Sequence, residues 1–140
     1  MKNENYDKYI EVLNEELITA LGCTEPIAIA LAAAVAAKEL GSTPKEIIAD
    51  CSGNIIKNVK GVTVPNSGGQ RGVEIAAILG AFYGNADNKL EVLTGVTEKN
   101  IEESRKLLKE DICKVNLVEG VANLFVGVTV KSDNDYARAE

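Results

Sequence analysis

The sequence predicts an α+β fold whose core is mainly helical. Two alanine-rich apolar segments, residues 26–37 and 73–83, have the length and composition of buried helices. Residues 111–140 instead alternate apolar and polar side chains, as strands of a short antiparallel β segment do. A chain of 140 residues that is 46% hydrophobic is long enough for the core of one ordinary domain. We therefore expect buried helices followed by a short β segment.

The first expected element is an amphipathic helix that ends at Gly22. Between residues 6 and 21 apolar side chains recur at helical spacing, while acidic side chains occupy the other faces. The recurring residues are Tyr6, Tyr9, Ile10, Leu13, Leu17 and Leu21.

The second expected element is a central helix that runs to about Leu40 and ends at Gly41. Thr24 or Cys23 can cap it, and the acid and the proline that follow are both favourable in a first turn. Residues 26–37 contain no polar side chain, so this helix must be surrounded by neighbours on every side.

The middle of the chain mixes strand, loop and helix signals. Residues 46–66 combine β-branched runs with Gly and Asn, which predicts one or two short strands, or a strand and a turn. The glycine-rich loop "SGGQRG" follows, and residues 72–84 predict a second buried helix that ends at Gly84. Residues 85–96 predict a short helix or turn, after which Thr97 caps an amphipathic surface helix.

The composition changes after residue 111. The strings "ICKVNLVEG", "ANLFVGVTVKS" and "DYARAE" alternate apolar and polar residues and are separated by turn signals, which predicts antiparallel strands. The last strand pattern reaches Glu140 with no turn after it, so we expect the chain to be part of a larger protein.

Composition argues against several classes of function. With 21 acidic and 15 basic residues, no basic cluster, two Phe, four Tyr and no Trp, nucleic acid is not an expected partner. The longest apolar run is twelve residues, short of the roughly 20 that span a bilayer, and the amino terminus lacks a signal peptide's apolar run. We expect a cytoplasmic protein with no membrane partner. The absence of histidine excludes Ser-His-Asp and Cys-His catalysis and histidine metal ligation.

The three cysteines are widely spaced and form no C-x-x-C pair, so neither a disulfide framework nor a self-contained zinc site is predicted. Cys23 lies at the expected amino end of the central helix, where unpaired N–H donors favour the thiolate, the form that attacks or binds metal. The alternative is a small apolar residue that fills a turn. Cys51 and Cys113 are expected to be core residues.

Two further features have both a functional and a structural interpretation. Glu25 is either a functional carboxylate or simply a favourable first-turn acid. The string "PNSGGQRG" either cradles a carboxylate or phosphate with its backbone N–H groups or is a plain loop, and it matches neither a dinucleotide fingerprint nor a P-loop. A polar cluster precedes it and either donates hydrogen bonds there or faces water: Asn54, Lys57, Asn58 and Lys60.

Three strings together resemble the amino-terminal part of the L-cysteine desulfidase family, which is related to the iron–sulfur L-serine dehydratase alpha chain. They are "GCTEPIAIALAAAVAAKELG", "SGNIIKNVKGVTVPNSGG" and "RGVEIAAILGAFYGNADNKLEVL", and the similarity covers nearly the whole chain. The resemblance implies a lyase that eliminates hydrogen sulfide from L-cysteine to give pyruvate and ammonia. It also implies a 4Fe-4S cluster, held by three cysteines with one iron open to substrate, and no pyridoxal phosphate (PLP).

The resemblance further implies roles for individual residues. The family cysteine of the G-C-T-E-P string falls on Cys23, which would be a cluster ligand, and the other two family cysteines lie in a region outside this chain. Glu25 becomes a candidate catalytic carboxylate that orients the substrate amine or moves a proton. The candidate substrate-binding residues are Thr24, Asn66, Ser67, Gly68 and Gly69.

The resemblance also implies a domain organisation. Residues 1–110 correspond to the amino-terminal part of a mainly helical, cluster-binding domain, and residues 111–140 to the start of a smaller α/β insert. The implied partner is a small amino acid, L-cysteine or L-serine, and the oligomeric state is open, a homo-oligomer included. Two alternatives remain, an L-serine dehydratase-like deaminase and a non-catalytic amino-acid-binding or assembly module.

Overall fold

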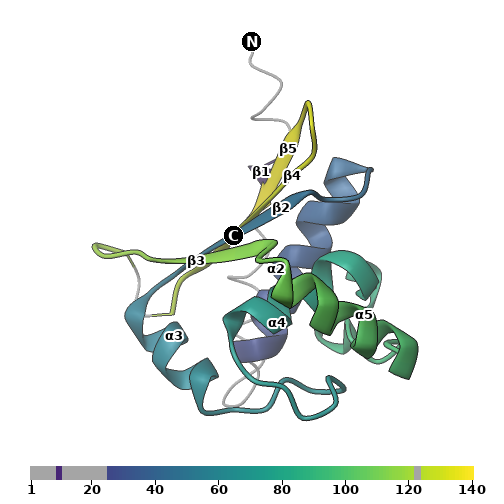
Figure 1. The fold of residues 1–140 in the computed structure, drawn as a ribbon. Coiled ribbons are helices and arrows are strands. Elements are labelled where there is room, and N and C mark those ends of the chain that lie inside the picture. Colours follow the sequence, from purple (N-terminus) through teal and green to yellow (C-terminus); the bar gives the residue numbers. More distant parts are fainter. Residues whose placement is uncertain (1–8, 11–24, 122–123) are drawn as a thin grey trace.

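The computed structural model describes residues 9–10, 25–121 and 124–140, and it has an α+β fold, as the sequence predicts. A mixed β-sheet carries two helices on one face, α2 (Glu25–Leu40) and α4 (Val73–Tyr83). A third helix, α5 (Glu98–Lys109), packs against α4 (Figure 1). The core therefore lies between the sheet and the α2–α4 pair.

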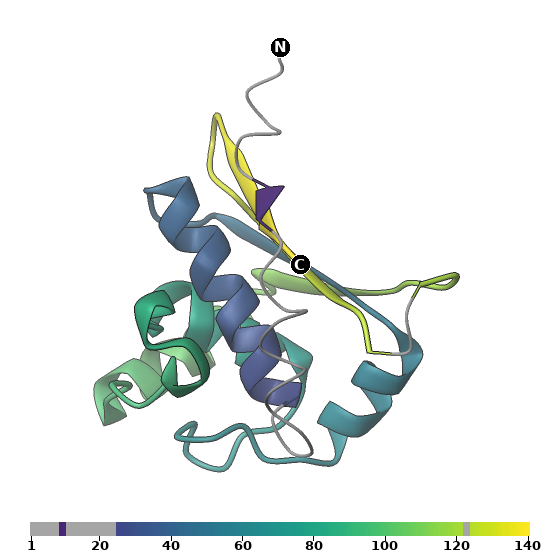
Figure 2. The same ribbon diagram turned by 180° about the vertical axis from the view of Figure 1, so that it is seen from behind.

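The expected central helix is confirmed as α2. Nearly all of its residues from Pro26 to Ala36 are buried, because strands contact one side of the helix and α4 the other (Figure 2). It ends as predicted before Gly41, whose φ of 75° is readily adopted by glycine. The second alanine-rich helix is also confirmed as α4, and Gly84 follows its last residue.

Within the described residues, the sheet contains five strands in the order β1-β5-β4-β2-β3. Their bounds are β1 Tyr9–Ile10, β2 Glu46–Cys51, β3 Cys113–Leu117, β4 Val126–Lys131 and β5 Tyr136–Ala139. β4 is antiparallel to both β2 and β5, as expected for the carboxy-terminal strands. The expectation is wrong for β3, which pairs parallel to β2. The helices between these two strands return the chain to the same end of the sheet, and such a crossover connection makes the pair parallel.

The expectation of only strands and turns in residues 46–66 is also wrong in part. β2 is followed by a helix, α3 (Gly53–Lys60), whose Ile55 and Val59 are one turn apart and fully buried. The remaining residues of this helix are mostly polar and exposed, so the segment is amphipathic with the period of a helix and not of a strand.

The remaining helical expectations agree with the structure where it describes them. Residues 85–96 contain a short 3-10 helix, η2 (Ala86–Glu91). Thr97 caps α5 in a capping box with Asn100, in which each side chain accepts a hydrogen bond from the other's backbone N–H. The amphipathic helix expected from residue 6 to residue 21 lies mostly outside the described residues, but Tyr9–Ile10 form a strand and not a helical turn.

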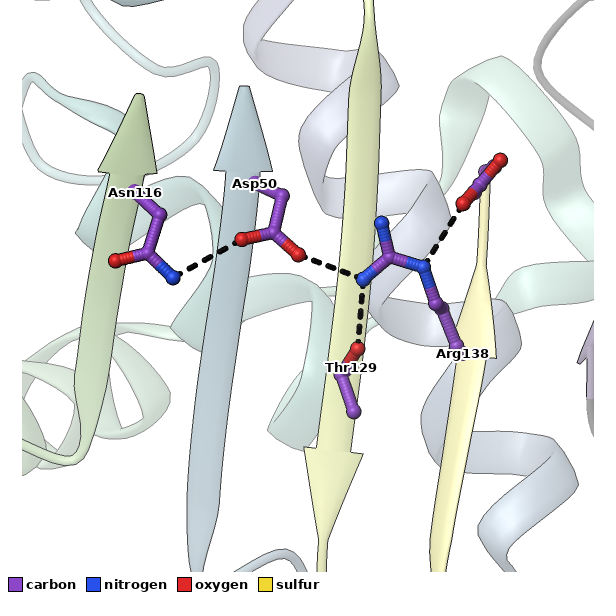
Figure 3. Close-up of polar contacts among 5 residues, drawn as sticks. Asp50, Asn116, Thr129 and Arg138 are labelled. Atoms are coloured by element: carbon purple, nitrogen blue, oxygen red, sulfur yellow. Dashed lines mark hydrogen bonds and ion pairs between the residues drawn. The ribbon is translucent and has the colours of Figure 1, made fainter. Parts of the chain in front are cut away.

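A polar network lies on the sheet face opposite the core (Figure 3). Arg138 of β5 reaches across Gly127 and donates to the Asp50 carboxylate at 2.7 Å and to the Thr129 hydroxyl at 2.8 Å. Asn116 of β3 donates to the other oxygen of Asp50 at 3.0 Å. The network thus ties four adjacent strands together through side chains.

The division into residues 1–110 and 111–140 remains a prediction about domain organisation. Within the described residues, strands from both sides of residue 110 pair in one sheet.

Candidate functional site

The candidate site lies at the amino end of α2, where Glu25 begins the helix. The Glu25 side chain is partly buried, and its Oε2 accepts a hydrogen bond of 2.9 Å from Nδ2 of Asn58 on α3. The two residues are 33 positions apart in sequence. The structure therefore brings one member of the predicted polar cluster to the candidate catalytic carboxylate.

The packing of α3 against the core brings Asn58 to Glu25. Ile55 and Val59 anchor one face of α3 in the core, which leaves Asn58 on the polar face. This contact was not predicted, because the sequence pattern of residues 46–66 indicated strands or turns and not a helix. The sequence signal for helix α3 is the helical spacing of Ile55 and Val59, which leaves Asn58 among the exposed polar residues.

Cys23 and Thr24 lie outside the described residues. In sequence they directly precede Glu25, so their assignments as cluster ligand and substrate-binding residue remain predictions.

The glycine-rich loop has the backbone that its sequence suggests. Asn66, Gly68 and Gly69 have φ values of 57°, 74° and 87°, and Gly72, with φ 110°, precedes the first turn of α4. Both glycines of the pair are exposed. In Figures 1 and 2 the loop and the amino end of α2 lie at the same end of the molecule.

The polar side chains of the loop hold its shape. Ser67 is 1% exposed, and its hydroxyl donates to the Val64 carbonyl at 2.6 Å and accepts from the Gln70 N–H at 3.0 Å. The Asn66 amide donates to the carbonyls of Leu93 and Val96 at 2.9 and 3.0 Å. Since these groups are engaged within the protein, a ligand contact made by this loop would come from the exposed backbone of the glycine pair.

Two side chains of helix α5 lie against the glycine-rich loop at Gly68. Arg105 donates to the Gly68 carbonyl at 3.4 Å, and a Cβ atom on Gly68 would stand 3.0 Å from the Arg105 guanidinium and 3.1 Å from Ile101. Glycine is therefore favoured at this position by its positive φ, and a larger residue would also have to displace these two α5 side chains.

Two of the cysteines are core residues, as predicted. Cys51 is fully buried and Cys113 is 5% exposed, and burial is the main cause that raises the pKa of each thiol to about 12. The neutral thiol is therefore the stable form at neutral pH, which makes both residues poor nucleophiles and poor metal ligands. Across residues 25–121 and 124–140 and the two residues of β1, no three or more acidic or cysteine side chains converge as a metal site.

A separate cavity of about 730 Å³ lies at the opposite end of α2. Lys38 of α2 and Asp87 of η2 form an ion pair of 2.6 Å beside it, but both side chains are more than half exposed. The residues that line this cavity include none of the predicted site residues, so we do not assign it to the candidate site.

These features define an α+β protein with a carboxylate held at the amino end of a buried helix. The chain is 52% identical over 127 residues to a UPF0597 protein of Finegoldia magna, which covers 91% of this chain and 30% of that protein. It is 45% identical over 140 residues to a UPF0597 protein of Treponema denticola, covering 100% of this chain and 32% of the relative. A UPF0597 protein of Lachnoclostridium phytofermentans is 46% identical over 135 residues, with 96% and 32% covered.

The chain thus spans about a third of the length of these curated relatives. No family model matches it, and no solved structure matches it. Among the helices that the structure describes, none combines the length and the apolar character needed to cross a membrane.

Proposed function

We propose that this chain is the amino-terminal part of an iron–sulfur-dependent lyase that eliminates hydrogen sulfide from L-cysteine. The supporting observation is the hydrogen bond from Asn58 that orients Glu25 at the start of a rigid, buried helix, directly after a cysteine and a threonine in sequence. A carboxylate held in this way can position the substrate amine or accept a proton.

The proposed reaction is an α,β-elimination. A base takes the proton from the α-carbon, and the Cβ–S bond breaks with its electron pair on sulfur. The resulting 2-aminoacrylate takes up water and yields pyruvate and ammonia. The proposed substrate class is a small amino acid, with L-serine as the alternative to L-cysteine, and the proposed setting is the cytoplasm.

The described residues do not supply the ligand set of a 4Fe-4S cluster. They contain no convergent group of three metal-binding side chains, and their two cysteines are buried as neutral thiols. In this proposal the cluster depends on Cys23 and on cysteines that the 140 residues do not include. The described residues would contribute the Glu25 carboxylate, oriented by Asn58, and the glycine-rich loop.

Anaerobic reconstitution of the full-length protein with iron and sulfide tests the proposal. We expect the wild type to show cluster absorbance and to release sulfide, pyruvate and ammonia from L-cysteine. Cys23→Ala should lose cluster iron and turnover, while Cys51→Ala, the matched control, should keep both because Cys51 is a core residue.

The other outcomes are equally informative. Unchanged iron content and turnover in Cys23→Ala would reject the ligand assignment. A retained cluster with lost turnover would make Cys23 a base or a sulfide carrier. Failure of the wild type to act on either L-cysteine or L-serine would reject the lyase.

The second candidate function is a non-catalytic module that binds an amino acid or assists assembly. The observation that favours it is the exposed backbone of Gly68 and Gly69 in the glycine-rich loop. Titration calorimetry of the iron-free 140-residue chain with L-cysteine and L-serine tests it. Binding without iron supports the module, and the absence of binding counts against it.

A further inference from the structure

We propose that Asn58 is a positioning residue for Glu25, an inference that rests on the proposed lyase function. Its amide Nδ2 donates to Glu25 Oε2 at 2.9 Å, from a different helix. Within the described part of the chain, Asn58 is the one residue that hydrogen-bonds to the Glu25 side chain. The bond engages one of the two carboxylate oxygens, Oε2.

The bond also limits the rotation of the carboxylate. A glutamate side chain at a helix start has three rotatable bonds, and without a partner it samples several rotamers. A reacting group must stay within a fraction of an ångström of its productive position, and a misplacement of about 1 Å can cost about a hundredfold in rate. Because the asparagine amide is neutral, it orients the carboxylate without introducing a second charge.

Asn58 is itself held by a rigid support. Ile55 and Val59 on the same helix are both 0% exposed, and α3 contacts both α2 and α4. Helix α3 therefore cannot rotate about its axis without exposing these two side chains. This packing fixes the Cα–Cβ bond of Asn58 on the polar face of α3, from which its amide reaches Glu25.

The chain offers a matched control on the same helix. Asn54 lies four residues before Asn58, so it is on the same face of α3, and it is also exposed. No hydrogen bond joins it to Glu25 among the described residues. The variants Asn54→Ala and Asn58→Ala thus remove the same chemical group from neighbouring positions.

The test is steady-state kinetics of the full-length protein with L-cysteine. We expect Asn58→Ala to lower kcat by about tenfold to a hundredfold with little change in KM, because the lost contact orients a group that acts in the transition state. Cluster iron content should stay at the wild-type level. Asn54→Ala should keep wild-type kcat and KM.

A length swap tests the pair directly. Glu25→Asp shortens the acid by one methylene and should lower kcat. Adding Asn58→Gln lengthens the amide by one methylene, restores the contact and should recover part of the lost rate. This readout does not depend on how Asn58→Ala folds, and a merely structural role for Asn58 would not produce the recovery.

Three results would overturn the inference. They are wild-type kinetics in Asn58→Ala, equal losses in Asn54→Ala and Asn58→Ala, and a double variant no faster than Glu25→Asp alone. None of these three results argues against the proposed lyase activity, provided that the wild type turns over. Absence of wild-type turnover with either L-cysteine or L-serine instead rejects the proposed function itself, together with this role.

Discussion

Gly80 of α4 lies directly against the backbone of Ala30 of α2. A Cβ atom on Gly80 would stand 2.7 Å from both the carbonyl carbon and the Cα of Ala30. The two helices approach this closely because one side has no side chain and the other has only a methyl group. This contact helps to hold α2, and with it the Glu25 end of the helix.

Replacing Gly80 by alanine should therefore destabilise the protein. Glycine to alanine within a helix normally stabilises by up to about 1 kcal/mol. Here the added methyl group must force the helices apart, and we expect a net loss of about 1–3 kcal/mol. Urea unfolding of the chain followed by circular dichroism measures it. Gly95→Ala, where a Cβ would meet nothing within 4 Å, should change stability by less than about 0.5 kcal/mol. A Gly80→Ala variant as stable as the wild type would contradict this packing.

The network around Arg138 should contribute measurably to stability. Arg138 pairs with Asp50 at 2.7 Å and with Glu140 at 2.9 Å, and all three side chains are 25% exposed or less. Arg138→Met removes the cationic partner of Asp50, whose side chain is only 20% exposed and keeps the hydrogen bond from Asn116. After allowance for partial solvent screening, we expect a loss of about 1–2 kcal/mol in the free energy of unfolding.

The matched control for Arg138→Met is an exposed ion pair. Lys45 and Asp133 are 3.7 Å apart, and their side chains are 66% and 74% exposed. Lys45→Met should change the free energy of unfolding by less than about 0.5 kcal/mol. If both variants lost the same stability in urea unfolding at pH 7, the sheet network would have no special role.

The buried thiols predict a loss of stability at alkaline pH. Burial raises the pKa of Cys51 and Cys113 from 9.0 to about 12 in the folded protein, while the unfolded chain keeps the ordinary value. Between pH 9 and 12 the folded state therefore binds more protons than the unfolded state, and stability falls as the pH rises. Each thiol adds a slope of up to about 1.4 kcal/mol per pH unit.

Urea unfolding at a series of pH values above 8 measures this slope. The double variant Cys51→Ala/Cys113→Ala should show a shallower slope than the wild type, even though its absolute stability is lower. The slope of Tyr83→Phe is the comparison, because burial also raises the pKa of Tyr83, from 10.0 to about 12, so this phenol contributes to the slope in the same direction. An identical slope in the cysteine double variant would show that the thiols are not neutral in the folded protein.

Ser67 should act as a structural residue of the glycine-rich loop. Ser67→Ala leaves the buried Val64 carbonyl and the Gln70 N–H without their hydroxyl partner. We expect a loss of about 1–3 kcal/mol and faster proteolysis of the loop. Ser42→Ala, at an exposed position, is the control and should behave as the wild type in urea unfolding and limited proteolysis. A Ser67→Ala variant with wild-type stability would contradict this structural role.

The sequence predicted the elements that are specified by local patterns. The two alanine-rich helices, the end of α2 before Gly41 and the Thr97 cap depend on residues within a few positions of each other. The prediction failed at α3, where a short segment with glycines and β-branched residues suits either a strand or a helix. It also failed for the direction of β3, because strand direction depends on how the intervening helices return the chain.

The sequence by itself determined an α+β chain with two buried helices, two thiols suited to the core and a Cys-Thr-Glu string ahead of the apolar residues of the central helix. Only the tertiary structure decided which distant side chains meet. Glu25 and Asn58 are 33 residues apart, and Asp50 and Arg138 are 88 residues apart. Such contacts are set by strand register and helix packing, to which every element of the core contributes. No local stretch of sequence carries that information, and the candidate site therefore becomes defined only when the chain is folded.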